Sequence, residues 1–199
     1  MIKNKKIVIS GGPGSGKTTL VNLLRDKGYK CFDEYSRILI QSAQKKGENN
    51  IFKSHPLFFS EEVWKGREEQ YKKSGPSLGK AQKPYVFFDR GLHDVVAYLE
   101  CIGAPYDSQK FDLSNYTYDI ALLLPPWKAI YIKDNERKED FEEAEKFYFY
   151  IKNTYQKNNI PIVEIPIQTP EVRISTLLEY LDHGKNAWLL TALLEKRCL

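Results

Sequence analysis

One segment near the start of the chain has the residue types and spacing of a phosphate-binding loop. Residues 11–18 read Gly-Gly-Pro-Gly-Ser-Gly-Lys-Thr and fit the pattern G-x-x-x-x-G-K-[ST] at every required position. Glycines let such a loop adopt positive φ and turn its backbone N–H groups toward an anion at a helix N-terminus. We expect Lys17 to reach the β- and γ-phosphates and the Thr18 hydroxyl to bind Mg²⁺. The predicted nucleotide-binding residues are Gly11, Gly12, Pro13, Gly14, Ser15, Gly16, Lys17, Thr18 and Thr19.

This motif is specific, because a chance match in a chain of this length is expected in on the order of 1% of cases. Residues 6–10 before it form a β-branched run, and residues 17–27 after it have a helical pattern. The motif therefore lies between a strand and a helix, as a P-loop requires. A plain glycine turn would not explain the Lys17-Thr18 pair. The motif predicts triphosphate binding and leaves open what happens to the γ-phosphate.

Two carboxylates follow predicted strands, at the edge where ligands bind in an open α/β sheet. Asp89 comes after the apolar run 85–88 and resembles the Asp of a Walker B strand, so we expect it to hold Mg²⁺ directly or through water. Glu34 comes after the predicted strand 29–33, and we expect it to take the proton from an acceptor hydroxyl, with Asp94 as the reserve base. Helix capping by Asp89 and a helix-dipole contact by Glu34 are the alternatives.

Several arginines could stabilise the charge that spreads over a transferred phosphoryl group. Arg137 follows the fourth predicted strand, in the usual place of a lid arginine, with a solvated charged face as the alternative. Arg37 lies one turn beyond Glu34 and could face the same site. Trp64 and Arg67 lie where nucleotide kinases recognise the acceptor, with a plain amphipathic helix as the alternative. The predicted catalytic residues are Lys17, Glu34, Asp89 and Arg137, and the predicted substrate-binding residues are Arg37, Arg67, Arg90 and Asp94.

The elements that must position these residues alternate between strand and helix. The expected strands are apolar on both faces, which indicates a parallel sheet covered by helices on both sides. The sequence therefore predicts an α/β, three-layer P-loop NTPase fold with a parallel five-stranded sheet and a helical lid. We expect residues 1–184 to form this domain, with the lid at about 126–146 and a helical tail at 185–199. The expected strands are 6–10, 29–33, 85–88, 120–124 and 160–165, and the expected helices are 17–27, 34–46, 55–73, 94–102, 136–155 and 170–181.

Composition excludes several classes of protein. The net charge of +4 is too small and too scattered to indicate nucleic-acid binding. The cysteines at 31, 101 and 198 are odd in number and widely spaced, so they predict neither a disulfide framework nor a zinc site. We find no signal peptide and no stretch long enough to span a membrane, and we expect a cytoplasmic protein. The tail could dock on the domain, form a dimer contact or touch a membrane surface.

Motifs of other P-loop classes are absent from the sequence. Neither the guanine-reading N/T-K-x-D nor the D-x-x-G switch of Ras-type GTPases occurs, and the chain is too short for an AAA+ motor with its helical lid domain. The signature segment of ABC proteins is also missing. A compact kinase-like P-loop domain is what remains.

The motifs together resemble a family of small stand-alone P-loop proteins. The shared blocks are ISGGPGSGKTTL at 9–20, EYSR at 34–37, FDRG at 88–91 followed by Asp94, AYL at 97–99, LPPW at 124–127 and D-x-E-R at 134–137. This family, often labelled "AAA domain" or "predicted ATPase", is similar to the ribosylnicotinamide kinase domain of the bacterial NAD regulator. The resemblance extends to about residue 181.

The resemblance implies a nucleoside-kinase-like fold that binds ATP or GTP. It implies that Lys17 and Thr18 are phosphate and Mg²⁺ ligands. Some related eukaryotic proteins resemble GTP-dependent lipid binders rather than kinases. The further active-site positions that the resemblance implies are Glu34, Arg37, Asp89, Arg90 and Arg137.

Two functions follow as hypotheses. The first is an Mg-dependent enzyme, a small-molecule kinase or ATPase. As a kinase it would move the γ-phosphate of ATP (or GTP) to a hydroxyl or phosphate group on a nucleoside-like metabolite. The second is a nucleotide-dependent switch with slow hydrolysis, which would use the tail or the 50–82 region to reach a protein or lipid partner.

Overall fold

The computed structural model describes residues 4–45, 47, 51–75, 83–130 and 141–183. Residues 131–140 of the predicted lid, with Arg137, and the predicted tail at 185–199 lie outside these residues. The domain boundary at 184, the lid arginine and the tail contacts therefore stay predictions. Within the described ranges, no helix combines the length and apolarity needed to cross a membrane.

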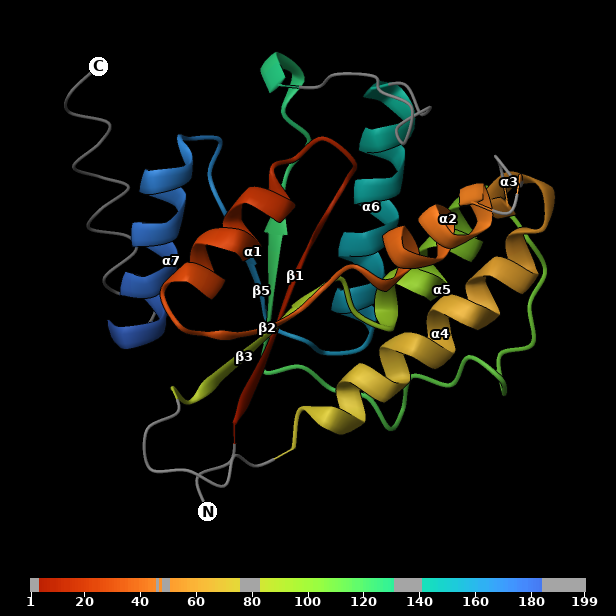
Figure 1. Ribbon diagram of the computed structural model, residues 1–199, viewed down its shortest axis with the longest axis horizontal. Coiled ribbons are helices and arrows are strands. Elements are labelled where there is room, and N and C mark those ends of the chain that lie inside the picture. The colour runs from red at the N-terminus through yellow and green to blue at the C-terminus, as the bar shows by residue number, and fades with distance from the viewer. Residues whose placement is uncertain (1–3, 46, 48–50, 76–82, 131–140, 184–199) are drawn as a thin grey trace.

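The centre of the fold is one parallel sheet (Figure 1). Its five strands run in the order β2-β3-β1-β4-β5, and every neighbouring pair is parallel. The first strand of the sequence is therefore the central strand of the sheet. The strands are β1 (Lys5–Gly11), β2 (Lys30–Phe32), β3 (Tyr85–Asp89), β4 (Ile120–Leu124) and β5 (Ile162–Glu164).

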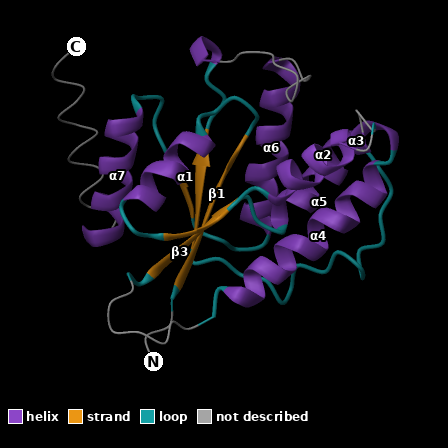
Figure 2. Ribbon diagram, viewed as in Figure 1, coloured by secondary structure: helices purple, strands orange, loops and turns teal. Residues whose placement is uncertain are grey.

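Helices cover the sheet on both faces (Figure 2). Helices α1 and α7 pack on one face, while α5 and α6 pack on the other with α4 beyond them (Figure 1). This arrangement confirms the predicted three-layer α/β fold. The helices are α1 (Lys17–Asp26), α2 (Tyr35–Lys45), α3 (Ile51–Ser54), α4 (Pro56–Lys73), α5 (His93–Ile102), α6 (Phe141–Lys157) and α7 (Pro170–His183), and a short 3₁₀ helix spans Lys128–Ile130.

Alternation along the strands explains the two cores. In β1, Ile7 and Ile9 face the core under α1 and α7, whereas Val8 between them faces the core under α5 and α6. All three side chains are fully buried. A strand buried on both faces reads as a continuous apolar run, which is why the sequence predicts a parallel sheet here. Ile151 and Tyr155, one helical turn apart on α6, are also fully buried.

The strand register brings the candidate residues to one edge of the sheet. Ile9 pairs with Asp89, and Phe32 pairs with Phe88, so the segments that follow β1, β2 and β3 start side by side. The P-loop follows β1, Glu34 lies two residues beyond β2, and Asp89 is the last residue of β3. Parallel strands thus collect three distant segments at their carboxyl ends.

The structure differs from the predicted boundaries mainly at the edge strands. β2 and β5 are shorter than predicted, because each is an edge strand that pairs with only one neighbouring strand. Before β2, the Tyr29 backbone N–H donates to the Leu24 carbonyl oxygen in the turn after α1, so Tyr29 does not belong to the strand. The short helix α3 was not predicted, since a four-residue helix has too few turns to show a periodic pattern. Helix α6 is described from Phe141, so the predicted start at 136 lies outside the described residues.

Candidate functional site

The P-loop backbone is held in a conformation that requires glycine. Gly14 and Gly16 have φ values of 71° and 85°. Gly11 has a φ of 147°, and a Cβ there would clash with the Leu124 carbonyl oxygen on β4. A Cβ on Gly12 would lie 2.9 Å from the Ala144 carbonyl oxygen on α6. The loop backbone therefore packs closely against β4 and α6, and this packing favours an anion cradle of defined shape.

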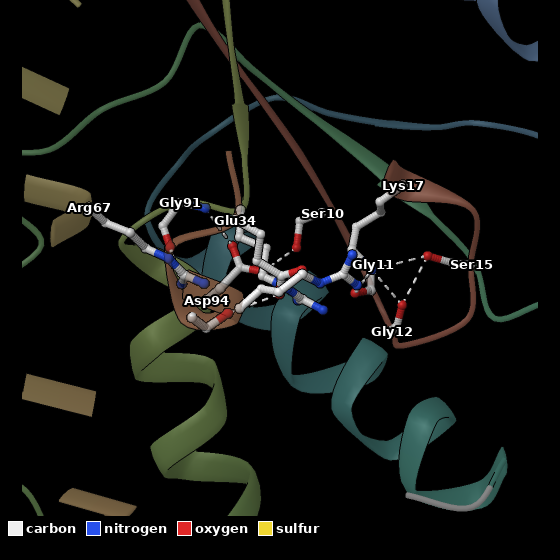
Figure 3. A network of polar contacts seen from close by, with 12 residues as sticks. Ser10, Gly11, Gly12, Ser15, Lys17, Glu34, Arg67, Gly91 and Asp94 are labelled. Atoms are coloured by element: carbon white, nitrogen blue, oxygen red, sulfur yellow. Dashed lines mark hydrogen bonds and ion pairs between the residues drawn. The ribbon is translucent and has the colours of Figure 1, made fainter. Parts of the chain in front are cut away.

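Lys17 is folded along this loop (Figure 3). Its Nζ donates hydrogen bonds to the carbonyl oxygens of Gly11 at 3.1 Å and Gly12 at 2.7 Å, and to Ser15 Oγ at 3.3 Å. Burial lowers the pKa of Lys17 to about 7, and the Arg90 charge acts in the same direction. An anionic phosphate beside Nζ would favour the charged form again. The geometry therefore fits the predicted phosphate-binding role of Lys17.

Glu34 and Arg90 form a largely buried ion pair beside the P-loop. Arg90 Nε donates to Glu34 Oε1 at 2.8 Å, and the two side chains are 9% and 18% exposed. Burial alone would raise the pKa of Glu34, but the Arg90 and Lys17 charges outweigh it and lower the pKa to about 2. Arg37, in the next turn, lies 4.0 Å from the other Glu34 oxygen. Glu34 is therefore a carboxylate at all ordinary pH values.

Asp94 lies deeper in the same network. Its Oδ2 accepts hydrogen bonds from the Gly91 backbone N–H at 3.0 Å and from Tyr155 Oη at 2.7 Å. Its Oδ1 accepts from Arg90 Nη1 at 3.1 Å and from Ser10 Oγ. Burial would raise the pKa of Asp94, but the Arg90 charge and these donors lower it. The predicted substrate residue Asp94 lines the cavity, yet each of its oxygens already has two donors from the protein.

Asp89 is placed differently from the other two carboxylates. It is 5% exposed, and within the described part of the chain its Oδ1 has no hydrogen-bond partner. Burial raises the pKa of Asp89 to about 6, and the Glu34 charge adds to this effect. A cation would relieve an orphaned buried oxygen of this kind. The residues fit Mg²⁺, because this ion is held by one or two protein oxygens together with substrate phosphates, and Thr18 and Asp89 could supply them.

A cavity of about 600 Å³ joins the P-loop to the helices on one side of the sheet. One part is lined by the P-loop, from Pro13 to Thr19, and the ion pair of Glu34 and Arg90 lines it as well. The rest is largely apolar and aromatic. Its walls come from α2 to α6 and include Ile40, Phe52, Phe59, Val63, Val95, Tyr98 and Phe147.

Two buried polar groups of α4 line this cavity without satisfying all their hydrogen bonds. Ser60 is 2% exposed and Arg67 is 4% exposed. Arg67 Nη1 donates to the Gly91 carbonyl oxygen at 2.8 Å (Figure 3), but Arg67 Nε and Ser60 Oγ have no partner in the described part of the chain. Trp64, which we expected near an acceptor, is not among the residues that line the cavity, and it packs edge-on against Phe111 and Tyr116. The position of Trp64 therefore lends no support to a part in acceptor binding, whereas Arg67 lines the cavity.

Three residues near the site were not found from the sequence. Tyr155 contacts Asp94 from α6, Ser60 lines the cavity, and Arg173 of α7 donates to the Ser15 carbonyl oxygen at 2.7 Å. Tyr155 follows Ile151 by one helical turn, a spacing that predicts core packing, and its hydroxyl gives no separate signal in the sequence. No pattern links residue 173 to residue 15.

The comparisons with known proteins agree with this geometry. The sequence model of a family described as an AAA domain matches residues 6–173. No curated protein matches the chain. Among solved structures, deoxyadenosine kinase from M. mycoides with bound dATP has a TM-score of 0.62 at 18% identity, covering 89% of this chain and 99% of that chain. The same enzyme with bound dCTP has a TM-score of 0.60 at 18% identity, with 89% and 98% covered.

At this identity the likeness establishes the fold. It supports the broader resemblance to nucleoside kinases rather than the specific one to ribosylnicotinamide kinase. The match of the family model extends over most of the chain, from β1 into α7. The chain belongs to this AAA-domain family, and its fold is that of a nucleoside-kinase-like P-loop NTPase.

Proposed function

We propose that the protein transfers the γ-phosphoryl group of an Mg²⁺-bound nucleoside triphosphate to a hydroxyl group of a nucleoside-like acceptor. The observation that carries this proposal is the single cavity that runs from the P-loop, past Glu34 and Arg90, to aromatic walls. A hydrolase needs room only for water beside the γ-phosphate. A roomy apolar extension of the same cavity favours an organic second substrate.

The donor would bind in the P-loop. Its backbone N–H groups and the N-terminus of α1 would surround the β-phosphate, and Lys17 would leave its loop carbonyls to contact the β- and γ-phosphates. Thr18 and Asp89 would hold Mg²⁺, which supplies charge neutralisation when bound. We take ATP as the donor, with GTP as the alternative. Arg137 would add a further cation from the lid.

The acceptor would lie in the aromatic part of the cavity. Four aromatic side chains line this part, in two contacting pairs, Phe52 with Phe59 and Tyr98 with Phe147, and such a lining suits a flat ring. Unpaired donors favour a ring or sugar that carries hydrogen-bond acceptors, because burying such groups without partners costs about 1–3 kcal/mol each. Among the described residues that line the cavity, the donors without a partner are Ser60 Oγ and Arg67 Nε.

Glu34 would orient the acceptor hydroxyl toward the γ-phosphate. With a pKa of about 2, it is a weak base for an alcohol. A strong base is unnecessary, because the transition state of phosphoryl transfer is loose and the attacking hydroxyl keeps most of its proton until late. Glu34 would accept that proton as the new bond forms, while Arg90 stabilises the charge on the transferred group.

The test follows γ-labelled ATP and γ-labelled GTP with Mg²⁺ and a pool of nucleosides, nucleotides and vitamins. The wild-type protein is compared with Lys17→Ala and with Arg25→Ala, a control on the exposed side of α1. We expect label in an organic product with the wild type and the control and none with Lys17→Ala. Label that appears only as inorganic phosphate, whatever the pool, would overturn the kinase and favour the nucleotide switch.

A further inference from the structure

The Asp94 carboxylate joins its own helix, α5, to three other segments of the fold. Its donors are Ser10 from β1, Arg90 and Gly91 from the segment after β3, and Tyr155 from α6. Two donors to each oxygen leave little capacity for a ligand. Charge-assisted hydrogen bonds of this kind are roughly twice as strong as neutral ones. Asp94 is therefore suited to hold protein groups in place.

Arg90 has a strained backbone, and several contacts restrain its position. Its backbone has a φ of 70°, a left-handed conformation that residues other than glycine rarely adopt. Its backbone N–H is bound to the Ile9 carbonyl oxygen at 3.0 Å, and its guanidinium bridges Glu34 and Asp94. Backbone strain of this kind persists only where the surroundings fix the residue. The same guanidinium donates to Glu34, which lines the cavity together with the P-loop.

Tyr155 supplies the donor that comes from farthest away. It lies 61 residues beyond Asp94 in the sequence and is fully buried. Its ring stacks on His93, with centroids 4.9 Å apart, and a Cβ on Gly91 would lie 2.7 Å from its hydroxyl oxygen. Burial raises the pKa of Tyr155, so its hydroxyl stays protonated and can donate. A buried aromatic ring with one fixed hydroxyl leaves Asp94 Oδ2 a single preferred position.

We propose that Tyr155 is a positioning residue whose hydroxyl orients the Asp94 carboxylate and, through it, the Arg90 guanidinium that faces Glu34. Helix α6 also carries Phe147 on the cavity wall. One helix therefore both shapes the cavity and fixes the ion pair beside it. The proposal concerns the geometry of the protein, and it rests on the proposed function only for its effect on turnover.

Nuclear magnetic resonance of ¹⁵N-arginine-labelled protein tests the geometry without any ligand. The probe is hydrogen exchange at Arg90 Nε, assigned with Arg90→Lys. We expect Tyr155→Phe to speed this exchange about tenfold or more, because Asp94 Oδ2 loses a donor while the ring stays in place. Tyr118→Phe is the matched control, since Tyr118 is also buried in this layer but accepts from the Leu92 N–H at 3.2 Å. Unchanged exchange in Tyr155→Phe, or equal acceleration in both variants, would overturn the proposal.

A second measurement uses only the wild-type protein, so it does not depend on whether the Tyr155→Phe variant folds. The Tyr155 hydroxyl proton, observed in tyrosine-labelled protein, should exchange slowly enough to give a resolved signal. A rapidly exchanging Tyr155 hydroxyl proton would contradict the proposal even without the variant.

Label transfer from γ-labelled ATP then separates this proposal from the proposed function. We expect Tyr155→Phe to lower kcat between about tenfold and a hundredfold, with the affinity for the nucleotide unchanged, since small misplacements of reacting groups have effects of this size. Faster Arg90 exchange without any label transfer in the wild type would support the positioning role and refute the kinase. Faster exchange with an unchanged kcat would refute the claim that this positioning serves catalysis.

Discussion

Arg173 on α7 is hydrogen-bonded to Ser15 in the P-loop, although the two residues lie far apart in the sequence. Arg173 Nη1 on α7 donates to the Ser15 carbonyl oxygen of the P-loop at 2.7 Å, and the two residues are 158 positions apart. Arg173 Nε donates to the Pro166 carbonyl oxygen at 2.9 Å, and the guanidinium lies 5.0 Å from the centre of the Trp127 ring. The last described helix thus restrains the outer side of the phosphate loop.

Arg173→Met should weaken nucleotide binding. The variant keeps the length of the side chain but leaves the Ser15 carbonyl oxygen without its partner, and the loop loses a restraint. We expect the dissociation constant for ATP to rise about tenfold and the free energy of unfolding to fall by about 1–3 kcal/mol. Calorimetric titration and denaturant unfolding measure the two effects. Arg25→Ala removes an exposed pair and should change neither; unaltered ATP binding in Arg173→Met would contradict the restraint.

Gly66→Ala should disturb the segment that carries Glu34. A Cβ at Gly66 on α4 would clash with the ring of Tyr35, the residue next to Glu34. Overpacking of this kind typically costs about 1–3 kcal/mol. We expect that loss in denaturant unfolding, together with slower label transfer.

The control for Gly66→Ala is the double variant Gly66→Ala with Tyr35→Ala. Removing the ring makes room for the added methyl group, so the cost of Gly66→Ala should be much smaller in the Tyr35→Ala background than in the wild type. Equal costs in both backgrounds would show that the contact with Tyr35 is not the cause.

His93 should make the protein less stable in acid. It is fully buried, both ring nitrogens lack partners in the described part of the chain, and burial lowers its pKa from 6.5 to about 4. Between these two values the unfolded chain binds a proton that the folded chain does not, so the free energy of unfolding falls as the pH falls. From pH 7.5 to pH 5 this effect amounts to about 2 kcal/mol.

His93→Phe isolates this contribution. A phenylalanine can keep the stacking on Tyr155 and has no group that titrates. The difference in unfolding free energy between the variant and the wild type should therefore shift by about 2 kcal/mol in favour of the variant on going from pH 7.5 to pH 5. A difference that is the same at both pH values would show that His93 keeps an ordinary pKa in the folded state.

The sequence predicts those parts of the protein that local pattern determines. Strands such as 85–88 and 120–124 are apolar on both faces, and the P-loop glycines mark the turn between β1 and α1. The positions of Glu34 and Asp89 at strand ends follow from the rule for parallel sheets. Because Arg90 directly follows Asp89, its proximity to Glu34 could be expected once the strand order was known.

Contacts between distant side chains could not be predicted in this way. Tyr155 lies one helical turn after Ile151, so the sequence pattern predicts that both side chains are buried. The pattern gives no information about the contacts of the Tyr155 hydroxyl. Trp64 and Arg67 are neighbours on one helix, yet only Arg67 lines the cavity, because the orientation of α4 depends on how it packs against α5. Such orientations follow from tertiary packing, which no single segment encodes.

The most direct test of the central claim compares Glu34→Gln with the wild type in single-turnover transfer from γ-labelled ATP, beside calorimetric ATP binding. We expect transfer to the organic acceptor to fall about a hundredfold or more, while the ATP dissociation constant stays within about twofold. Transfer at the wild-type rate, or loss of ATP binding in step with loss of transfer, would contradict the assignment of Glu34 to the acceptor hydroxyl.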